Sequence, residues 1–162
     1  MTPEETDCEM TQIILPGHTN NHGTAFGGQI TAWIDICASV SARRFSKAPV
    51  VTVSIDQVHF LRPVTLGMIL VLRSRVNQVW NTSMEIGVRV ELEDREGNRE
   101  LGATAYLTFV SLDEQGKAQP LPKLQNQDDP LNKRRSEDAD KRREVRLEVR
   151  DWRMKKRAES PN

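Results

Sequence analysis

The amino-acid sequence predicts an α+β protein in which one apolar helix is buried against an antiparallel sheet. Between Gln29 and Phe45 apolar side chains recur at helical spacing, whereas residues 50–112 are almost entirely of strand type and are joined by short connections. Short connections favour antiparallel neighbours, because a parallel pair needs a crossover of about a dozen residues or more. The single helix must then cover one face of the sheet.

The elements are expected in a simple order along the chain. A short strand over 11–15 ends at Pro16-Gly17, and a polar, glycine-containing loop over 18–28 leads into the helix. The apolar stripe of this helix consists of Ile30, Trp33, Ile34, Cys37 and Val40. Strands follow at 51–58, 69–79, 84–92 and 103–109, and the third alternates apolar and polar side chains without an error.

Composition divides the chain into a body and a tail. With 162 residues it has the length of one domain. Residues 125–162 hold 12 of the 23 Lys and Arg and 9 of the 23 Asp and Glu, so a body near −3 precedes a tail near +3. We therefore expect a flexible leader over 1–9, one domain over 10–118, a linker over 119–135, a charged helix over 136–157 and a disordered end over 158–162.

The predicted tail helix has an apolar stripe of only Val145, Val149 and Trp152, so its helicity should depend on docking. Candidate ion pairs at i,i+4 are Glu137–Lys141, Asp138–Arg142 and Asp151–Lys155. Its basic clusters raise the possibility of nucleic-acid binding. Because acids are interspersed and only Trp152 offers a stacking ring, we favour a solvated helix face instead, with room for one phosphate-binding arginine.

Several classes of protein are disfavoured. No apolar run approaches the roughly 18–20 residues that span a bilayer, and the N-terminus is acidic and polar, so neither a membrane span nor a secretory signal is expected. Cys8 and Cys37 form no metal or redox motif and are expected to be free thiols in a reducing compartment, the cytoplasm. Cys37 is interpreted as a core residue.

Asp35 and the loop before the helix are the candidate chemical features. Asp35 lies mid-helix among apolar neighbours, and either meets solvent on the polar side with Thr31 and Ser39 or faces a cleft as an acid or base. Gly28 begins the helix, where free N–H groups and the positive dipole end suit an oxyanion, although a tight turn explains the glycines equally well. Asn20 and His22 add donors nearby, whereas His59 is interpreted as a strand residue.

Taken together, residues 16–112 resemble the hotdog-fold acyl-CoA thioesterases, in particular the branch of the brown-fat-inducible and cytosolic acetyl-CoA hydrolases. The resemblance rests on residues 22–29 (HGTAFGGQ), 32–35 (AWID), 51–56 (VTVSID), 82–85 (TSME) and 108–110 (TFV), and on Arg142-Arg143 followed by residues 145–147 in the tail. It implies a long central helix wrapped by an antiparallel sheet and paired with a second hotdog unit. Members of that branch carry two hotdog domains in one chain, whereas this sequence has one, so it is either a single-domain relative or a fragment.

The resemblance also implies roles for individual residues. The site would lie between two units, with Asp35 from one helix and Asn20 from the loop of the other, while the Gly28 N–H polarises the thioester carbonyl. CoA would follow the backbone at Val53-Ser54-Ile55 and at Thr82-Ser83-Met84, and Arg143 would meet a CoA phosphate. No metal or cofactor is implied, since CoA is part of the substrate and product.

These observations together predict an acyl-CoA hydrolase that releases a free carboxylic acid and CoA and works as a homodimer or a higher assembly of dimers. Asp35 would act either as a general base on water or as a nucleophile that forms an anhydride. Two alternatives remain open: a hotdog dehydratase, for which only His22 lies near enough to remove a proton, and a non-catalytic sensor that binds CoA or acyl-CoA in the same cleft.

Overall fold

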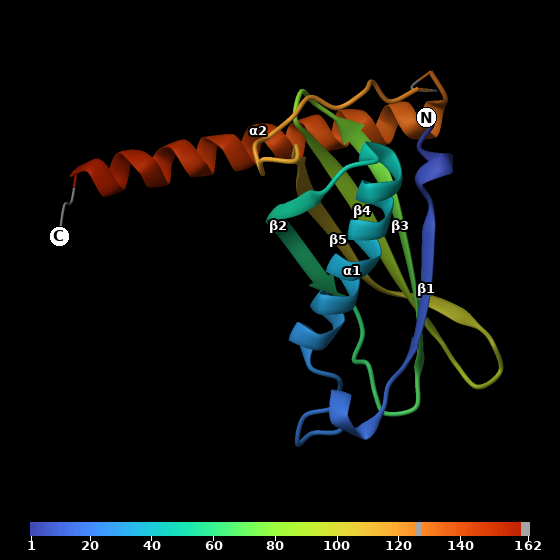
Figure 1. Cartoon of the computed structure of the whole chain (residues 1–162). Helices are drawn as coiled ribbons and strands as arrows, with labels where there is room; N and C mark the ends of the chain where they lie inside the picture. The colour runs from blue at the N-terminus through green and yellow to red at the C-terminus, as the bar shows by residue number, and fades with distance from the viewer. Residues whose placement is uncertain (126–127, 160–162) are drawn as a thin grey trace.

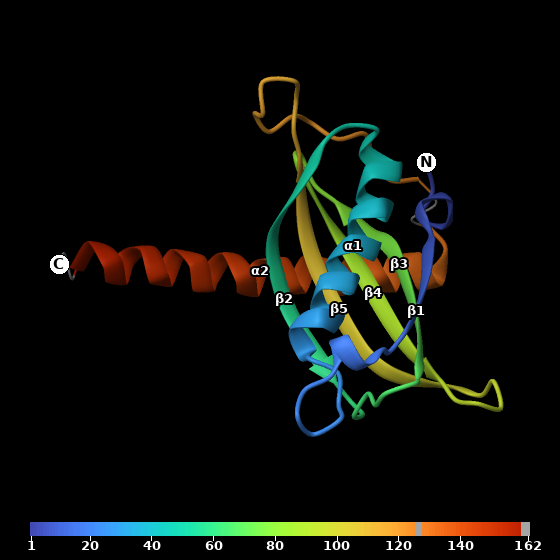
Figure 2. The same cartoon turned by 60° about the horizontal axis from the view of Figure 1, so that its bottom comes forward.

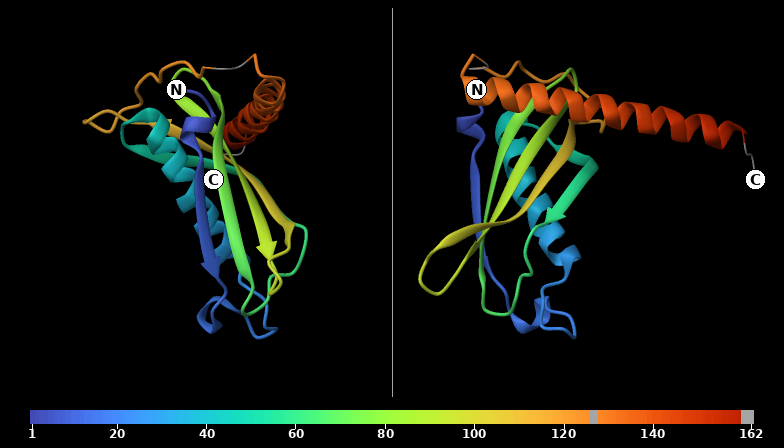
Figure 3. Two further views of the ribbon diagram at one scale, coloured as in Figure 1. Left: turned by 90° about the vertical axis from the view of Figure 1, so that its right-hand side faces the viewer. Right: turned by 180° about the vertical axis from the view of Figure 1, so that it is seen from behind.

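The computed structural model of the chain describes residues 1–125 and 128–159 and forms three layers, helix, sheet and helix. The long helix α1 (Gly27–Ser46) lies along one face of a five-stranded sheet, and α2 (Pro130–Glu159) crosses the opposite face (Figures 1 and 3). The strands are β1 (Cys8–Ile13), β2 (Val50–Phe60), β3 (Ile69–Val79), β4 (Ser83–Glu93) and β5 (Arg99–Ser111). Two 3-10 turns, η1 (Glu4–Thr6) and η2 (Pro16–His18), flank β1.

The sheet has the strand order β1-β3-β4-β5-β2, and every neighbouring pair is antiparallel. This confirms the predicted α+β fold, in which an antiparallel sheet wraps around one long helix. β1 and β2 form the two edges, so β2 pairs with β5 on one side only. The outer edge of β2 therefore carries backbone groups that are available to a second strand.

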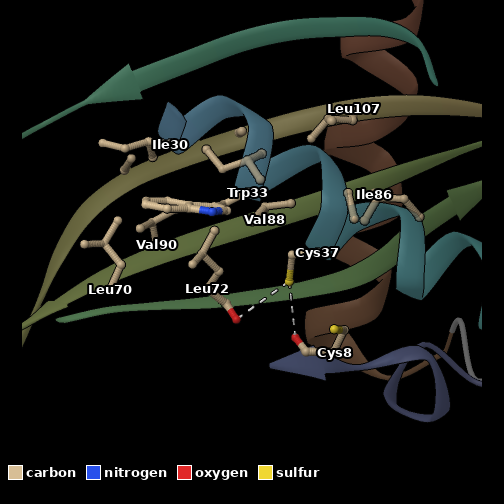
Figure 4. Packing of buried hydrophobic residues seen from close by; sticks show 14 of the residues in the cluster. Cys8, Ile30, Trp33, Cys37, Leu70, Leu72, Ile86, Val88, Val90 and Leu107 are labelled. Carbon is tan, nitrogen blue, oxygen red and sulfur yellow. Dashed lines mark hydrogen bonds between the residues drawn. The ribbon is translucent and has the colours of Figure 1, made fainter. Parts of the chain in front are cut away.

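The core fills the space between α1 and the sheet. β4 contributes alternate side chains from Met84 to Leu92, all of them buried, as the error-free alternation predicts. Trp33 and Cys37 of α1 point onto β3 and β4, where Leu72 and Val88 lie around them (Figure 4). Complete burial of an aliphatic or aromatic side chain contributes about 1.5–3 kcal/mol, so this face holds α1 in place.

Cys37 is fully buried in this core, which confirms its interpretation as a core residue. Its thiol lies 3.8 Å from the carbonyl oxygen of Cys8 and 3.7 Å from that of Leu72 (Figure 4). Burial raises the pKa of Cys37 to about 12, although a hydrogen bond with Ser74 opposes the shift. Both cysteines are free and buried.

Two irregularities in β2 change which face its residues occupy. The register against β5 passes from Thr52 to Ser54 and from Ile55 to Gln57, so Val53 and Asp56 are left without partners. Each bulge adds one residue and interrupts the inward–outward alternation. As a result, Thr52 points to the α1 side of the sheet, whereas Ser54 and Asp56 lie on the α2 side.

The N-terminal segment differs from expectation. Residues 1–9 were expected as a flexible leader, but they contain η1 and the start of β1, which begins at Cys8 rather than at residue 11. The acidic side chains that suggested a solvated leader are ion-pair partners of β3: Asp7 meets Arg75 at 2.5 Å and Glu9 meets Arg73 at 2.7 Å. The antiparallel pairing of β1 with β3 and the hydrogen bond from the Val76 N–H to Thr6 Oγ1 hold this segment, and the exposed ion pairs add little to them.

The C-terminal helix is longer than expected and docks through a different face. It starts at Pro130, inside the expected linker, and its last described residue is Glu159. Val145, Val149 and Trp152 were expected to dock but are 59%, 42% and 61% exposed. Helix residues that pack on the body include Ala139, Arg142 and Arg146, while the distal half of α2 projects past the β2 edge (Figure 2). The observed i,i+4 pair on the helix is Arg134–Asp138 at 3.9 Å, not one of the three expected.

Candidate active site

Asn20 organises the loop that precedes α1. Its side-chain oxygen accepts the backbone N–H of His22 at 2.9 Å and that of Thr24 at 3.3 Å, and its Nδ2 donates to Thr24 Oγ1 at 2.9 Å. An amide nitrogen carries two hydrogens, so one donor of Asn20 stays available to a ligand. His22 is exposed, whereas His18 packs edge-on against Trp33 with ring centroids 4.9 Å apart and serves the loop's structure.

The start of α1 offers free backbone donors. Gln29 and Ile30 both donate to the carbonyl of Phe26, but no described residue accepts a hydrogen bond from the N–H of Gly28. Gly28 is exposed, and a Cβ built there would meet no atom within 4 Å, so the start of the helix is open to a ligand at this residue. A free N–H at the positive end of a helix stabilises a developing negative charge, which is the role expected for Gly28.

Asp35 is half-buried in the middle of α1 and is held by β2. Thr52 Oγ1 donates to Asp35 Oδ1 at 2.7 Å, which fixes the carboxylate against the edge strand. Within the described residues no hydrogen bond engages Oδ2, and that oxygen is left to act on water or on a carbonyl. The Asp35 carboxylate is therefore neither buried in the core nor free in solvent.

Two segments expected to follow CoA lie at the same level of the sheet. Thr52 and Met84 both pair with Phe109, so they flank β5 at about 10 Å from each other, or two strand spacings. Val53 is 56% exposed at its bulge, and Thr82 and Ser83 are partly exposed in the β3–β4 turn. Met84 is fully buried and its backbone pairs on both sides, so only the Thr82-Ser83 end of this segment is open to a ligand.

Three arginines in the middle of α2 have different partners on the body. Arg142 binds the completely buried Glu85 through two hydrogen bonds of 3.0 and 2.7 Å, and Arg146 pairs with Asp56. Arg143 lies 4.8 Å above the ring of Trp80 and has no ion-pair partner among the described residues. Of the three, Arg143 is thus the cation left for an external phosphate.

One chain does not bring all the candidate residues to one point. Gly28 and Asp35 are seven residues apart, or about 10 Å along the helix axis. The N–H of Gly28 points out of the N-terminal end of α1, away from Asp35. Within the described residues no hydrogen bond joins Asn20 to Asp35 either, since each is engaged locally. A single carbonyl group cannot therefore contact the Gly28 donor and the Asp35 carboxylate of the same chain.

Two further features of the described residues concern metal ligands and membrane spans. Among residues 1–125 and 128–159, no three His, Cys, Asp or Glu side chains come close enough to hold a metal ion. Within the same residues, no helix combines the length and the apolar character that crossing a membrane requires.

Comparisons with known proteins assign the chain to a family. Residues 22–97 match the thioesterase superfamily. A protein of Bacillus subtilis (strain 168) named "Uncharacterized acyl-CoA thioester hydrolase YkhA" is 42% identical over 129 residues, covering 76% of this chain and 75% of that protein. Acyl-coenzyme A thioesterase 11 of Mus musculus is 37% identical over 147 residues, and this chain spans 25% of its length. The chain belongs to the thioesterase superfamily.

Solved structures agree with this assignment. The acyl-CoA hydrolase of Staphylococcus aureus, in complex with butyryl-CoA, CoA and CoA disulfide, matches with a TM-score of 0.88 at 34% identity, covering 98% of this chain and 96% of that one. An apo hexameric acyl-CoA thioesterase matches with a TM-score of 0.86 at 37% identity, covering 92% and 96%. The expected hotdog arrangement is thus confirmed.

Three positions substituted in the S. aureus enzyme have a spacing that recurs in this chain and that includes Thr52, for which the sequence predicted no role. Structures of that enzyme include alanine substitutions of an asparagine, an aspartate and a threonine separated by intervals of 15 and 17 residues. Asn20, Asp35 and Thr52 have the same intervals here. Thr52 had no expected role because it lies in an apolar strand, and only the bulge at Val53 and the contact with Asp35 distinguish it.

Proposed function

We propose that this protein hydrolyses acyl-CoA thioesters to a carboxylic acid and CoA, at a site shared between two copies of the chain. The observation that carries the proposal is the Asp35 carboxylate, held by Thr52 beside the unpaired edge of β2 with its second oxygen free. The match in spacing with the three positions substituted in the S. aureus acyl-CoA hydrolase supports the same assignment.

The proposed chemistry needs only side chains, backbone and water. Asp35 takes a proton from water, whose oxygen adds to the thioester carbonyl. The Gly28 N–H and the Asn20 amide of the partner copy donate to the resulting oxyanion. Collapse of the tetrahedral intermediate breaks the C–S bond and releases the CoA thiolate, which takes up a proton. Attack by Asp35 itself, followed by hydrolysis of an anhydride, gives the same products.

The remaining proposals concern binding and assembly. CoA follows Val53-Ser54-Ile55 and Thr82-Ser83, with Met84 supporting the turn from the core, and Arg143 meets a phosphate. Pairing of β2 edges in a homodimer brings Asn20 of one copy towards Asp35 of the other, and a hexamer built from three such dimers has the precedent of the hexameric thioesterase. We place the protein in the cytoplasm, because two buried free thiols are typical of a reducing compartment.

Release of CoA from acetyl-, octanoyl- and palmitoyl-CoA tests the proposal. Asp35→Asn keeps the shape and polarity of the side chain but removes the base, so turnover should fall by about 10²–10⁴-fold on the best substrate. CoA binding should stay within a few-fold of the parent, because the nucleotide and pantetheine contacts persist.

Parent-like hydrolysis by Asp35→Asn would refute the catalytic assignment. If the parent binds CoA but cleaves none of the three substrates, the protein is a sensor. Loss of water from a 3-hydroxyacyl-CoA without release of CoA would instead identify a dehydratase.

A further inference from the structure

A groove of about 510 Å³ lies on the sheet face opposite α1, beneath the first half of α2. Its floor is the row of paired residues Arg75, Gly87 and Tyr106, from β3, β4 and β5. Gly87 keeps this floor low, because a Cβ there would approach within 2.6 Å of the Asn77 amide. The hollow therefore depends on a residue without a side chain in the middle strand.

The groove is lined by more cations than anions. Five arginines surround it, Arg73, Arg75, Arg89, Arg135 and Arg142. Only three acids do so, Asp7, Glu9 and Asp138. Four of the arginines have a carboxylate within hydrogen-bonding distance: Arg73 pairs with Glu9, Arg75 with Asp7, Arg89 with Glu91 and Arg142 with Glu85.

Arg135 is the exception. Its Nη1 is shielded from solvent and has no hydrogen-bond partner within the described residues. Burial lowers the pKa of Arg135, and the neighbouring Arg75 lowers it further. Asp7 and Glu4 compensate only in part, since both already pair with Arg75. A shielded guanidinium nitrogen without an acceptor is costly, and the charge of Arg135 is compensated only in part, so an anion at this place would stabilise the fold.

We infer that this groove binds a small phosphate-bearing anion through Arg135. The planar guanidinium forms paired hydrogen bonds with phosphate oxygens, and such an anion would supply Nη1 of Arg135 with the acceptor that it lacks. The groove has the size of small-molecule sites in general. It is separate from the proposed CoA contacts, because none of its lining residues belongs to Val53-Ser54-Ile55 or Thr82-Ser83-Met84, and Arg143 is not among them either.

The test uses the full chain, with pyrophosphate as the probe and sodium sulfate, citrate and sodium chloride at matched ionic strength as comparisons. Pyrophosphate should raise the melting temperature and give a calorimetric binding signal that the other salts do not reproduce. Arg135→Met keeps the length of the side chain but removes its charge. This variant should bind pyrophosphate about ten- to a hundredfold more weakly.

Arg135→Met should also change the melting temperature of the ligand-free protein, and this change is an increase. Without pyrophosphate, Arg135→Met should melt at a higher temperature than the parent, because it removes a half-buried, partly compensated cation whose shielded Nη1 has no hydrogen-bond partner in the described part of the chain. Arg134→Met is the matched control: it makes the same change one residue earlier, where the side chain is 80% exposed, and should leave both properties unchanged. Arg143→Ala should retain the pyrophosphate response, which separates this groove from the proposed CoA phosphate contact.

Three results would overturn the inference. Equal pyrophosphate binding by Arg135→Met and the parent places the anion elsewhere. An equal response to citrate or sulfate shows that no phosphate preference exists. If pyrophosphate has no effect and Arg135→Met changes the oligomeric state, the counter-charge of Arg135 is a carboxylate of a second copy.

Discussion

Thr52 and Asp35 form the contact on which the proposed chemistry depends. A carboxylate in the middle of a helix needs a hydrogen-bond donor from another element. Thr52 of the strand β2 supplies it, with 2.7 Å between Thr52 Oγ1 and Asp35 Oδ1. This hydrogen bond is charge-assisted, so it positions the carboxylate rather than merely satisfying it. The free Oδ2 is thereby directed, because rotation of the carboxylate would break the bond to Thr52.

Thr52→Val should lower kcat about ten- to a hundredfold with little change in KM, because a hydrogen bond to a charged group is worth about 1.5–3 kcal/mol. Thr52→Ser keeps the hydroxyl and should recover most of the loss. Steady-state kinetics on the best acyl-CoA substrate provide the measurement. A Thr52→Val enzyme with parental kcat would show that the contact only fills space.

At alkaline pH the free energy of unfolding should depend on the ionisation of the Cys37 thiol. The unfolded thiol ionises with its ordinary pKa of 9.0, whereas the folded thiol stays protonated to about pH 12. The unfolded state therefore binds fewer protons above pH 9, and the free energy of unfolding falls between pH 9 and pH 12. Chemical unfolding curves of the parent and of Cys37→Ala should converge over this range, and a constant difference between them would contradict the assignment.

For individual residues, the sequence predicted those features that depend on the pattern of neighbouring residues along the chain. A carboxylate inside an apolar helix identified Asp35 as unusual, and helical spacing placed Cys37 in the core. Thr52 could not be found in this way. Simple alternation in β2 is interrupted by the bulges at Val53 and Asp56, which depend on the pairing with β5 and not on the local sequence.

Among the elements, α2 departs most from expectation. A helix was predicted from its charge pattern, but its docking face was sought among its few apolar residues. The face instead combines the buried Asn132 and Ala139 with polar residues, among them Arg142 and Arg146, whose partners Glu85 and Asp56 lie on β4 and β2. Long arginine stems can pack while their charged ends pair, so a helix of low apolar content can dock.

Arg143→Ala should raise the KM for acyl-CoA about ten- to a hundredfold with little change in kcat, because a remote phosphate contact is made equally in the ground and transition states. Added salt should reproduce part of the effect by screening. Steady-state kinetics at two ionic strengths measure both. If the variant has the parental KM, Arg143 serves only to cover Trp80.

Arg142→Ala, in contrast to Arg143→Ala, should affect the stability of the fold. It leaves Glu85, which has no exposed surface, without its cation, and should lower the free energy of unfolding by about 3–5 kcal/mol. Thermal or chemical unfolding distinguishes the two, since Arg143→Ala should change stability far less. Similar losses of stability in both would mean that the two arginines hold α2 in the same way.

For the whole molecule, the central question is whether two copies share each site. The sequence predicted the fold and the candidate residues, but which chains meet was implied only by resemblance. The structure adds that the Gly28 donor and the Asp35 carboxylate of one chain face different regions.

Mixing two inactive variants tests the shared site directly. Asn20→Ala and Asp35→Ala should each be nearly inactive alone, and co-refolding equal amounts should restore about a quarter of parental activity, since half of the dimers are mixed and one of their two sites is intact. Mass measurement of tagged chains verifies the mixed dimers. Verified mixed dimers without activity would show that the site lies within one chain.

The burial of both cysteines has a practical consequence for assays that detect released CoA through its thiol. Because Cys8 and Cys37 are buried, a chromogenic disulfide reagent should react only with the thiol of released CoA while the protein is folded. In denaturant the same reagent should find two equivalents per chain. The same reagent therefore measures turnover under native conditions and the concentration of the chain, without substrate, in denaturant.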